Sequence, residues 1–308
     1  MTTAAEPLPA ELPLPGGVIG SVVRLSAFLS ATCLAPPAYL HRIQGRLASV
    51  RALGLGVSRE DYVRIPIQSF LLEHPGVGHV LIDTGFHPSV AVDPKKNLGR
   101  LGTLAFSGIE MDAADAVPAR LRAMGIDPHD VGVVVMTHLH SDHASAISEF
   151  GGATFVFSRA EWEAAGEPGG TRRGYVKSQF DHAFDYRTID FDSPEVDSFA
   201  TFGRAVDLFG DGSVRLVYTP GHTRGHVSVI ARLADREALV AGDAIYTMRT
   251  LREGAVPWLT QDEHRFKRSL REIQLYAKQT PGALIVPGHD LEAFRAAERE
   301  LSEVPGGA

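Results

Sequence analysis

The apolar residues of this chain gather into short runs that predict β-strands. Residues 131–137 (VGVVVMT) form a β-branched run of the kind that is buried on both faces of a sheet. Residues 213–218, 237–241 and 283–286 form three similar runs, and each ends at a turn that contains glycine. Because these runs are short and end at turn residues, we expect four buried strands.

A second pattern, alternation of apolar and polar side chains, marks residues 18–34. Such alternation predicts a strand with one face on the core and the other toward solvent. The apolar positions of this segment are Val23, Leu25, Ala27 and Leu29. Helices are expected at residues 144–150 and at residues 291–300, where the pattern is charged and balanced in sign.

Polar side chains of metal-ligand type stand after each of the four apolar runs. His138, His140, Asp142 and His143 follow the first run, His222 the second, Asp243 the third and His289 the fourth. Strand ends are stiff, whereas the loops that follow them are free to carry polar chemistry. We therefore expect these seven side chains to converge at one edge of the fold.

The number and type of these side chains favour a site for two metal ions. Imidazole nitrogen and carboxylate oxygen are accepted by zinc and other first-row divalent cations. One ion with an open position needs only three protein ligands, so seven suit two ions that share a bridging carboxylate. Two cations about 3.5–4 Å apart can hold a hydroxide and polarise a substrate oxygen. The sequence therefore predicts a hydrolase with two divalent ions per chain, and zinc is the expected metal.

The order and spacing of these motifs resemble the metallo-β-lactamase superfamily over nearly the whole chain. The resemblance rests on HLHSDH at 138–143, on the later GH, GD and GH pairs that end at His222, Asp243 and His289, and on LIDTG at 81–85. It implies an α/β fold, an αβ/βα sandwich of two mixed β-sheets flanked by helices.

The resemblance also assigns roles to the ligand side chains. It places His138, His140 and His222 on the first metal, Asp142, His143 and His289 on the second, and Asp243 between them. Asp83, in the LIDTG run, would orient a ligand histidine through its other ring nitrogen. His226 is expected to support its turn rather than to bind metal. The remaining histidines are expected to be surface or capping residues: His41, His74, His79, His87, His129, His182 and His264.

Differences from other branches of the superfamily narrow the range of reactions that we expect. The commonest β-lactamases use a cysteine ligand where this chain has Asp243, and the only cysteine here, Cys33, lies outside every motif. Flavodiiron oxidoreductases carry Glu at the place of Asp142 and need a flavin domain, for which the chain has no room. Glyoxalase II-like thioesterases share all seven ligands but add a basic C-terminal patch, which residues 291–300 lack.

Tyr246 gives the sharper indication of the reaction. It lies three residues after Asp243, at the Asp-x-x-Tyr spacing of N-acyl homoserine lactonases, which the chain also resembles in TPGHTxGHxS at 219–228. A phenol beside the metals would donate a hydrogen bond to the lactone oxygen as charge develops there. The alternative is a packing residue with its hydroxyl in water.

The function that this resemblance implies is a metal-dependent lactonase that opens N-acyl homoserine lactones, the reaction of quorum quenching. A hydroxide held between the two ions would attack the lactone, and Asp142 would return a proton to the leaving oxygen. An ester, thioester or phosphotriester hydrolase on the same scaffold is the alternative, and a non-catalytic metal protein is a third. Ser141 and Ser145 depart from the lactonase pattern, so the acyl-chain preference stays open.

Composition limits the partners of the chain. Its 308 residues carry 30 basic and 37 acidic side chains, and the net charge of −7 disfavours nucleic-acid binding. No segment resembles a targeting sequence or a membrane span. A single cysteine excludes an intrachain disulfide and favours a reducing, cytoplasmic compartment.

The expected organisation is a flexible tail at residues 1–17 and a single domain at residues 18–308. Two segments, residues 31–56 and 86–108, are expected to be long loops that wall an acyl pocket. The alternative for both is a solvated surface or a contact within a homodimer.

Overall fold

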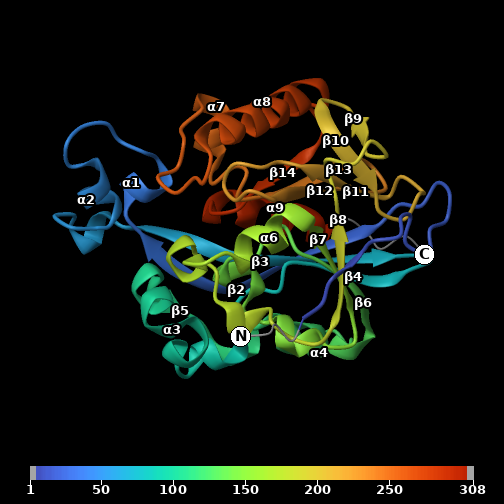
Figure 1. Cartoon of the computed structure of the whole chain (residues 1–308), viewed down its shortest axis with the longest axis horizontal. Coiled ribbons are helices and arrows are strands. Elements are labelled where there is room, and N and C mark those ends of the chain that lie inside the picture. The colour runs from blue at the N-terminus through green and yellow to red at the C-terminus, as the bar shows by residue number, and fades with distance from the viewer. Residues whose placement is uncertain (1–4, 304–308) are drawn as a thin grey trace.

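Two facing β-sheets form the centre of the computed structural model, which describes residues 5–303 (Figure 1). From edge to edge, the first sheet contains β1 (Leu8–Pro9), β8 (Asp185–Ile189), β7 (Thr154–Ser158), β6 (Val131–Val135), β4 (Gly78–Ile82), β3 (Val63–His74), β2 (Arg24–Ala35) and β5 (Ser107–Glu110). The second contains β14 (Leu284–Pro287), β13 (Glu237–Gly242), β12 (Val227–Arg232), β11 (Val214–Tyr218), β10 (Phe202–Asp207) and β9 (Asp197–Phe199). Each sheet combines parallel pairs, such as β4 with β6 and β13 with β14, with antiparallel ones.

Helices cover the outer faces of both sheets. Against the first sheet lie α4 (Val117–Ala123) and α6 (Arg159–Gly166), and against the second lie α7 (Met248–Glu253) and α8 (Glu263–Gln279). The remaining helices are α1 (Pro37–Leu40), α2 (Ala48–Ala52), α3 (Pro94–Ala105), α5 (Ser141–Ala144) and α9 (Leu291–Glu303). The predicted α/β sandwich of two mixed sheets flanked by helices is therefore confirmed.

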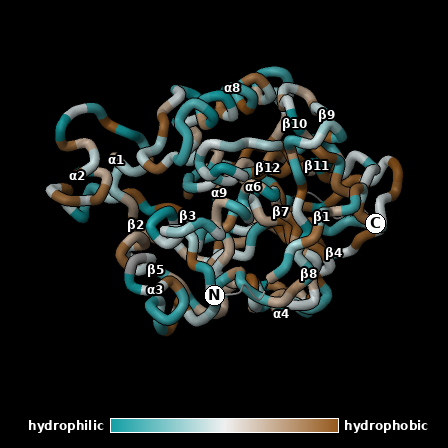
Figure 2. The backbone as a smooth tube through the Cα atoms, in the orientation of Figure 1, coloured by the Kyte–Doolittle hydropathy of each residue, from teal (hydrophilic) through white to brown (hydrophobic). Residues whose placement is uncertain are grey.

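The strands bury both faces, which explains why they appear in the sequence as short apolar runs. Val80 and Ile82 point into the core between the sheets, whereas Leu81 points toward α4. In the other sheet Val229 faces the same central core and Ile230 faces α8. Figure 2 shows hydrophobic stretches on these central strands.

Helix α8 shows how a covering helix is specified locally. The Asp262 carboxylate accepts a hydrogen bond from the backbone N–H of Arg265 and caps the first turn. Phe266, Leu270 and Ile273 recur at helical spacing and are buried against the second sheet. Among residues 5–303, none of the helices has the length and apolar character needed to cross a membrane.

Several expectations about local structure differ from what is observed. The alternating strand begins at Arg24 rather than at residue 18. Residues 144–150 do not form one helix, because α5 ends at Ala144 and a 3-10 turn, Ile147–Phe150, follows. Neither expected loop is plain: residues 31–56 contain the end of β2 with α1 and α2, and residues 86–108 contain α3, which Asp93 caps. His74 is not at the surface, since its ring is buried beside Asp211, but it does cap a turn: its Nδ1 accepts the backbone N–H groups of Gly76 and Val77.

The N-terminal segment expected as a flexible tail pairs with the sandwich where it is described. Residues 1–4 lie outside the described residues. Strand β1 adds to the edge of the first sheet in parallel with β8, with Leu8 opposite Arg187. Further along, the N–H of Leu14 donates to the carbonyl oxygen of Leu208 at 2.8 Å. The backbone hydrogen bonds of this segment are thus made to the body of the protein.

Candidate metal centre

The loops that follow β6, β11, β13 and β14 meet at one edge of the sandwich. They bring all seven predicted side chains into one buried set, called the ligand cluster below: His138, His140, Asp142, His143, His222, Asp243 and His289. Each of these residues is at most 6 % exposed. The first loop belongs to the first sheet and the other three to the second, so the cluster lies where the two sheets face each other.

One half of the cluster consists of three imidazoles. The Nδ1 atom of His140 lies 2.9 Å from Nε2 of His222. The ring of His138 stands 4.6 Å from the first ring and 4.8 Å from the second, centroid to centroid. Within residues 5–303, the buried Nε2 atom of His138 has no hydrogen-bond partner. Buried polar atoms normally have partners, so this orphan marks a place for an electrophile.

The other half of the cluster combines two imidazoles with a carboxylate. Oδ2 of Asp142 lies 3.5 Å from Nε2 of His143 and 3.6 Å from Nε2 of His289. Nitrogen and oxygen donors at this separation converge on one point, as ligands of a divalent cation do.

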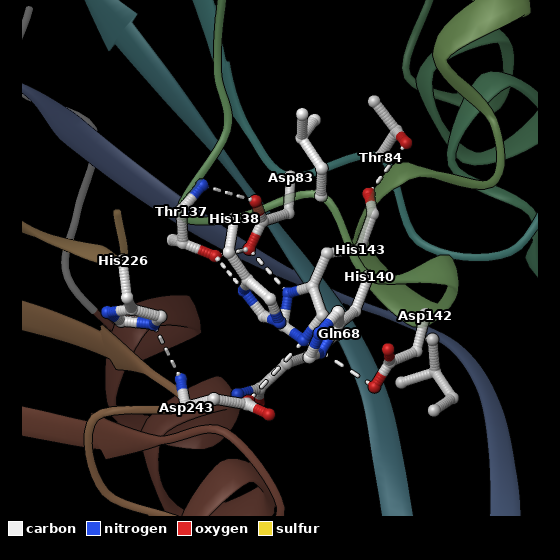
Figure 3. Close-up of polar contacts among 12 residues, drawn as sticks. Gln68, Asp83, Thr84, Thr137, His138, His140, Asp142, His143, His226 and Asp243 are labelled. Carbon is white, nitrogen blue, oxygen red and sulfur yellow. Dashed lines mark hydrogen bonds and ion pairs between the residues drawn. The ribbon is translucent and has the colours of Figure 1, made fainter. Parts of the chain in front are cut away.

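Asp243 stands between the two halves. Its Oδ2 atom is 3.2 Å from Nε2 of both His222 and His289, and its Oδ1 atom is 3.4 Å from Nε2 of His143. The backbone of this aspartate is held by His226, whose Nε2 accepts the N–H of Asp243 at 3.0 Å (Figure 3). As expected, His226 supports the local turn: its Nδ1 meets the Thr219 hydroxyl at 2.9 Å.

The electrostatics of the cluster suit a metal. Burial lowers the pKa of His138 and His222 well below the ordinary value and lowers the pKa of His140 to about 4. These three rings are therefore neutral at neutral pH, the state in which a ring nitrogen binds a metal. For His143, the carboxylates of Asp142 and Asp83 outweigh burial and raise the pKa well above its usual range. That half of the cluster thus favours positive charge.

Asp83 lies behind the cluster and contacts one ligand directly. Its Oδ2 atom is 2.7 Å from Nδ1 of His143, and its Oδ1 atom accepts the backbone N–H of Thr137 at 2.7 Å (Figure 3). With Nδ1 engaged in this way, Nε2 of His143 faces the cluster. The arrangement is the usual one for a histidine that binds metal.

Tyr246 is fully buried and lies against the ligand cluster. Its hydroxyl is 3.3 Å from Nδ1 of His222, and its ring centroid is 4.9 Å from that of His289. The hydroxyl is thus held against the cluster rather than in bulk water. Burial, with the neighbouring Tyr39 and Asp243, raises the pKa of this phenol well above the ordinary value, so it remains protonated and able to donate.

Comparison with known proteins identifies the family. Residues 63–289 match the family model of the metallo-beta-lactamase superfamily. The chain belongs to this superfamily. An N-acyl homoserine lactonase (AttM) of Azorhizobium caulinodans is 36% identical over 239 residues, which cover 76% of this chain and 85% of that protein. An N-acyl homoserine lactonase of Bacillus cereus is 30% identical over 237 residues, or 75% and 84% of the two chains.

Solved structures with this superfamily fold align with most of the chain. An AiiA variant of B. thuringiensis, with N-decanoyl-L-homoserine bound at its active site, matches with a TM-score of 0.68. The alignment covers 89% of this chain and 96% of that one at 23% identity. Likeness at this identity shows the superfamily fold.

A cavity of about 480 Å³ opens onto the cluster, and residues of both expected pocket segments, 31–56 and 86–108, line it. His140, Asp142, His222, Asp243, Tyr246 and His289 line its inner end. Apolar side chains line much of the rest: Leu34, Ala35, Pro36, Ala52 and Leu53 from the first expected pocket segment and Leu104, Ala105 and Phe106 from the second. Polar lining comes from Arg59, Ser107, Thr171 and Arg172. Both segments therefore wall a pocket beside the cluster.

Three further residues that lie near the cluster are not singled out in the sequence analysis. Tyr39 lies 6.1 Å from Tyr246, centroid to centroid, and also lines the cavity. Tyr175 packs its ring 4.9 Å from that of His140. Glu161 is buried behind the first ligand loop and accepts the N–H of Leu139. Only Glu161 has a local signature, the Ser-x-x-Glu spacing of a helix cap. That spacing predicts that its carboxylate accepts the N–H of the cap residue rather than that of Leu139.

Proposed function

We propose that the protein is a metal-dependent lactonase that opens the ring of N-acyl homoserine lactones. The observation that carries this proposal is the Tyr246 hydroxyl, which lies beside the ligand cluster at the inner end of an apolar cavity. Relatives that are 34–36% identical and are N-acyl homoserine lactonases support the same reaction.

The ligand cluster would hold two divalent ions, and zinc is the proposed metal. His138, His140 and His222 would bind one ion, Asp142, His143 and His289 the other, and Asp243 both. Two such ions, when bound, supply Lewis acidity for a carbonyl oxygen and lower the pKa of water.

The Tyr246 hydroxyl is proposed to stabilise the lactone carbonyl oxygen as negative charge develops on it. With Nε2 of His222 engaged by the proposed metal, the ring proton would lie on Nδ1 and be donated to the Tyr246 oxygen, 3.3 Å away. The proton of Tyr246 is then free to be donated to the substrate. A donor held in a buried site contributes more than it would in water.

Asp142 is proposed to carry a proton to the leaving ring oxygen. Its side chain lines the cavity, while Oδ2 faces His143 and His289. A carboxylate in this position can take up the proton that the attacking water gives up and deliver it to the alkoxide as the ring opens.

The apolar wall of the cavity is proposed to bind the acyl chain. Leu34, Ile65 and Phe106 line it beyond the cluster, and burial of each CH₂ group there contributes about 0.8 kcal/mol. Affinity should therefore rise with acyl length until the chain fills the pocket.

A substrate panel tests the proposed reaction. Purified protein, loaded with zinc, would be given acyl homoserine lactones from butanoyl to dodecanoyl, an aryl ester, a thioester and a phosphotriester. We expect the highest kcat/KM on the lactones, with a ring-opened hydroxy acid as the product. A higher kcat/KM on the thioester or phosphotriester would replace the lactonase assignment.

A further inference from the structure

Glu161 is buried completely behind the ligand cluster, and the proposed reaction does not use it. It lies in the first turn of α6, whose N-cap, Ser158, accepts the Glu161 N–H at 3.0 Å. In a capping box the glutamate side chain would return to the N–H of the cap residue. Here the carboxylate instead accepts hydrogen bonds from other parts of the chain.

Each oxygen of Glu161 holds a different ligand loop. Oε1 accepts the backbone N–H of Leu139 at 3.0 Å, and this residue lies between His138 and His140. Oε2 accepts the backbone N–H of Gly225 at 3.2 Å, three residues after His222. One carboxylate thus ties the loop after β6 to the loop after β11.

Tyr175 extends this connection to the ring of the ligand His140. The Tyr175 hydroxyl donates to Oε1 of Glu161 at 3.0 Å, and its ring lies 4.9 Å from that of His140. The same hydroxyl accepts from Nε2 of Gln261 at 3.2 Å, and the backbone N–H of Gln261 donates to the carbonyl oxygen of His222 at 3.1 Å.

Close packing restricts movement of the Gly225 loop relative to Glu161. A Cβ atom on Gly225 would lie 2.1 Å from the backbone nitrogen of Glu161, so the second loop is seated directly on the start of α6. Burial raises the pKa of the Glu161 carboxyl, and burying such a group is costly unless hydrogen bonds offset the cost. Three donors do so here.

All these contacts lead to the three-histidine half of the cluster. In the other half, His143 is supported by Asp83 instead. We propose that Glu161 is a positioning residue that sets the geometry of His138, His140 and His222 for one of the two ions. This inference rests on the proposed two-metal site.

The test compares Glu161→Gln with Glu163→Gln, which makes the same change on an exposed side chain of the same helix. Zinc content and the affinity of each ion would be measured by chelator competition, well below the melting temperature. In Glu161→Gln we expect one ion to bind about 10- to 100-fold more weakly, the usual effect of removing support behind a ligand, and the other to be unchanged. The control should bind both ions as the wild type does.

A second variant identifies the affected ion. His140→Ala should lose the ion that Glu161→Gln weakens, so the double variant should retain the same remaining ion with unchanged affinity. Loss of both ions in the double variant would overturn the inference, as would unchanged binding in folded Glu161→Gln.

Two further measurements distinguish a wrong role for Glu161 from a wrong metal site and from a variant that does not fold. If wild-type protein binds fewer than two ions, the proposed site fails rather than the role of Glu161. If Glu161→Gln does not fold, Tyr175→Phe removes one donor and keeps the carboxylate. That variant should weaken the same ion by a smaller factor, and unchanged affinity there would contradict the inference.

Discussion

Asp83 and His143 form a hydrogen bond of 2.7 Å between Oδ2 and Nδ1, and this contact decides which ring nitrogen faces the ligand cluster. Asp83 adopts a φ of 56°, a left-handed conformation that is rare for a residue other than glycine. The strain is held in place because Thr137 and His143 together engage both carboxylate oxygens.

Asp83→Asn should therefore weaken the ion proposed for Asp142, His143 and His289. The amide has one acceptor where the carboxylate has two, so either Thr137 or His143 loses its partner. We expect about a 10- to 100-fold loss of affinity for that ion. Chelator competition measures it, with Asp112→Asn, which alters an exposed 3-10 cap, as the control. If Asp83→Asn bound this ion as tightly as the wild type does, Asp83 would have no supporting role at the site.

Substitution of Asp243 should lower the metal content of the protein more than substitution of His289. Its two oxygens face both halves of the cluster, whereas His289 faces one. Elemental analysis should find close to two ions per chain in the wild type, about one in His289→Ala and fewer in Asp243→Ala. Equal metal content in the two variants would contradict the bridging position.

Removal of metal should also lower the stability of the wild type. Binding to the folded state alone contributes about 2.7 kcal/mol when free metal stands at 100 times Kd. A chelator should thus lower the melting temperature, and added zinc should restore it. An unchanged melting temperature would show that the cluster holds no metal under these conditions.

Tyr246→Phe should lower kcat by roughly 10- to 1000-fold without changing metal content, because one oxyanion donor is removed and the packing is kept. Both kcat and kcat/KM should fall together, as for an interaction made only in the transition state. Tyr39→Phe is the informative comparison, since that phenol lines the same cavity. Full activity in Tyr246→Phe together with loss in Tyr39→Phe would transfer the donor role to Tyr39.

Asp211 should make stability depend on pH. Burial raises its pKa, but hydrogen bonds from Ser213, Val18 and His74 outweigh burial and hold it below the ordinary 3.8. Because the folded-state pKa is depressed, the stabilisation is present above pH 3.8 and is lost as pH falls toward the folded-state value.

Asp211→Asn should accordingly destabilise the metal-free protein by about 1.5–3 kcal/mol at neutral pH, the range for hydrogen bonds to a charged group. The difference from the wild type should shrink as the pH falls. Urea unfolding at several pH values measures this, with the exposed Asp235→Asn as the control. A difference that stays constant with pH would show that the charge of Asp211 contributes nothing.

Sequence alone predicts the positions of His222, Asp243 and His289 well, because each follows an apolar run whose end is visible in the chain. Strands β11, β13 and β14 begin or end within a residue or two of the predicted limits. Strand ends of neighbouring segments meet at a sheet edge, so convergence follows from local pattern and topology.

Glu161 could not be found in this way, because its partners are distant in the chain. Leu139 and Gly225 lie 22 and 64 residues away, and the local Ser-x-x-Glu spacing predicts only a helix cap. Helix α3 is not predicted from the sequence, for a different reason. Asp93 and Pro94 give a proper start signal, but Gly99 breaks the helical backbone with a φ of 68° and obscures the periodicity.

Each half of the ligand cluster draws on both sheets. His138 and His140 follow a strand of the first sheet and meet His222 from the second; Asp142 and His143 likewise meet His289. During synthesis, neither half can be completed by an early fragment of the chain, since the second sheet emerges later. The last ligand in the chain, His289, follows β14 and is therefore made only after the strands of both sheets. Metal capture would then report that the two sheets have docked, and a truncated product would remain unloaded.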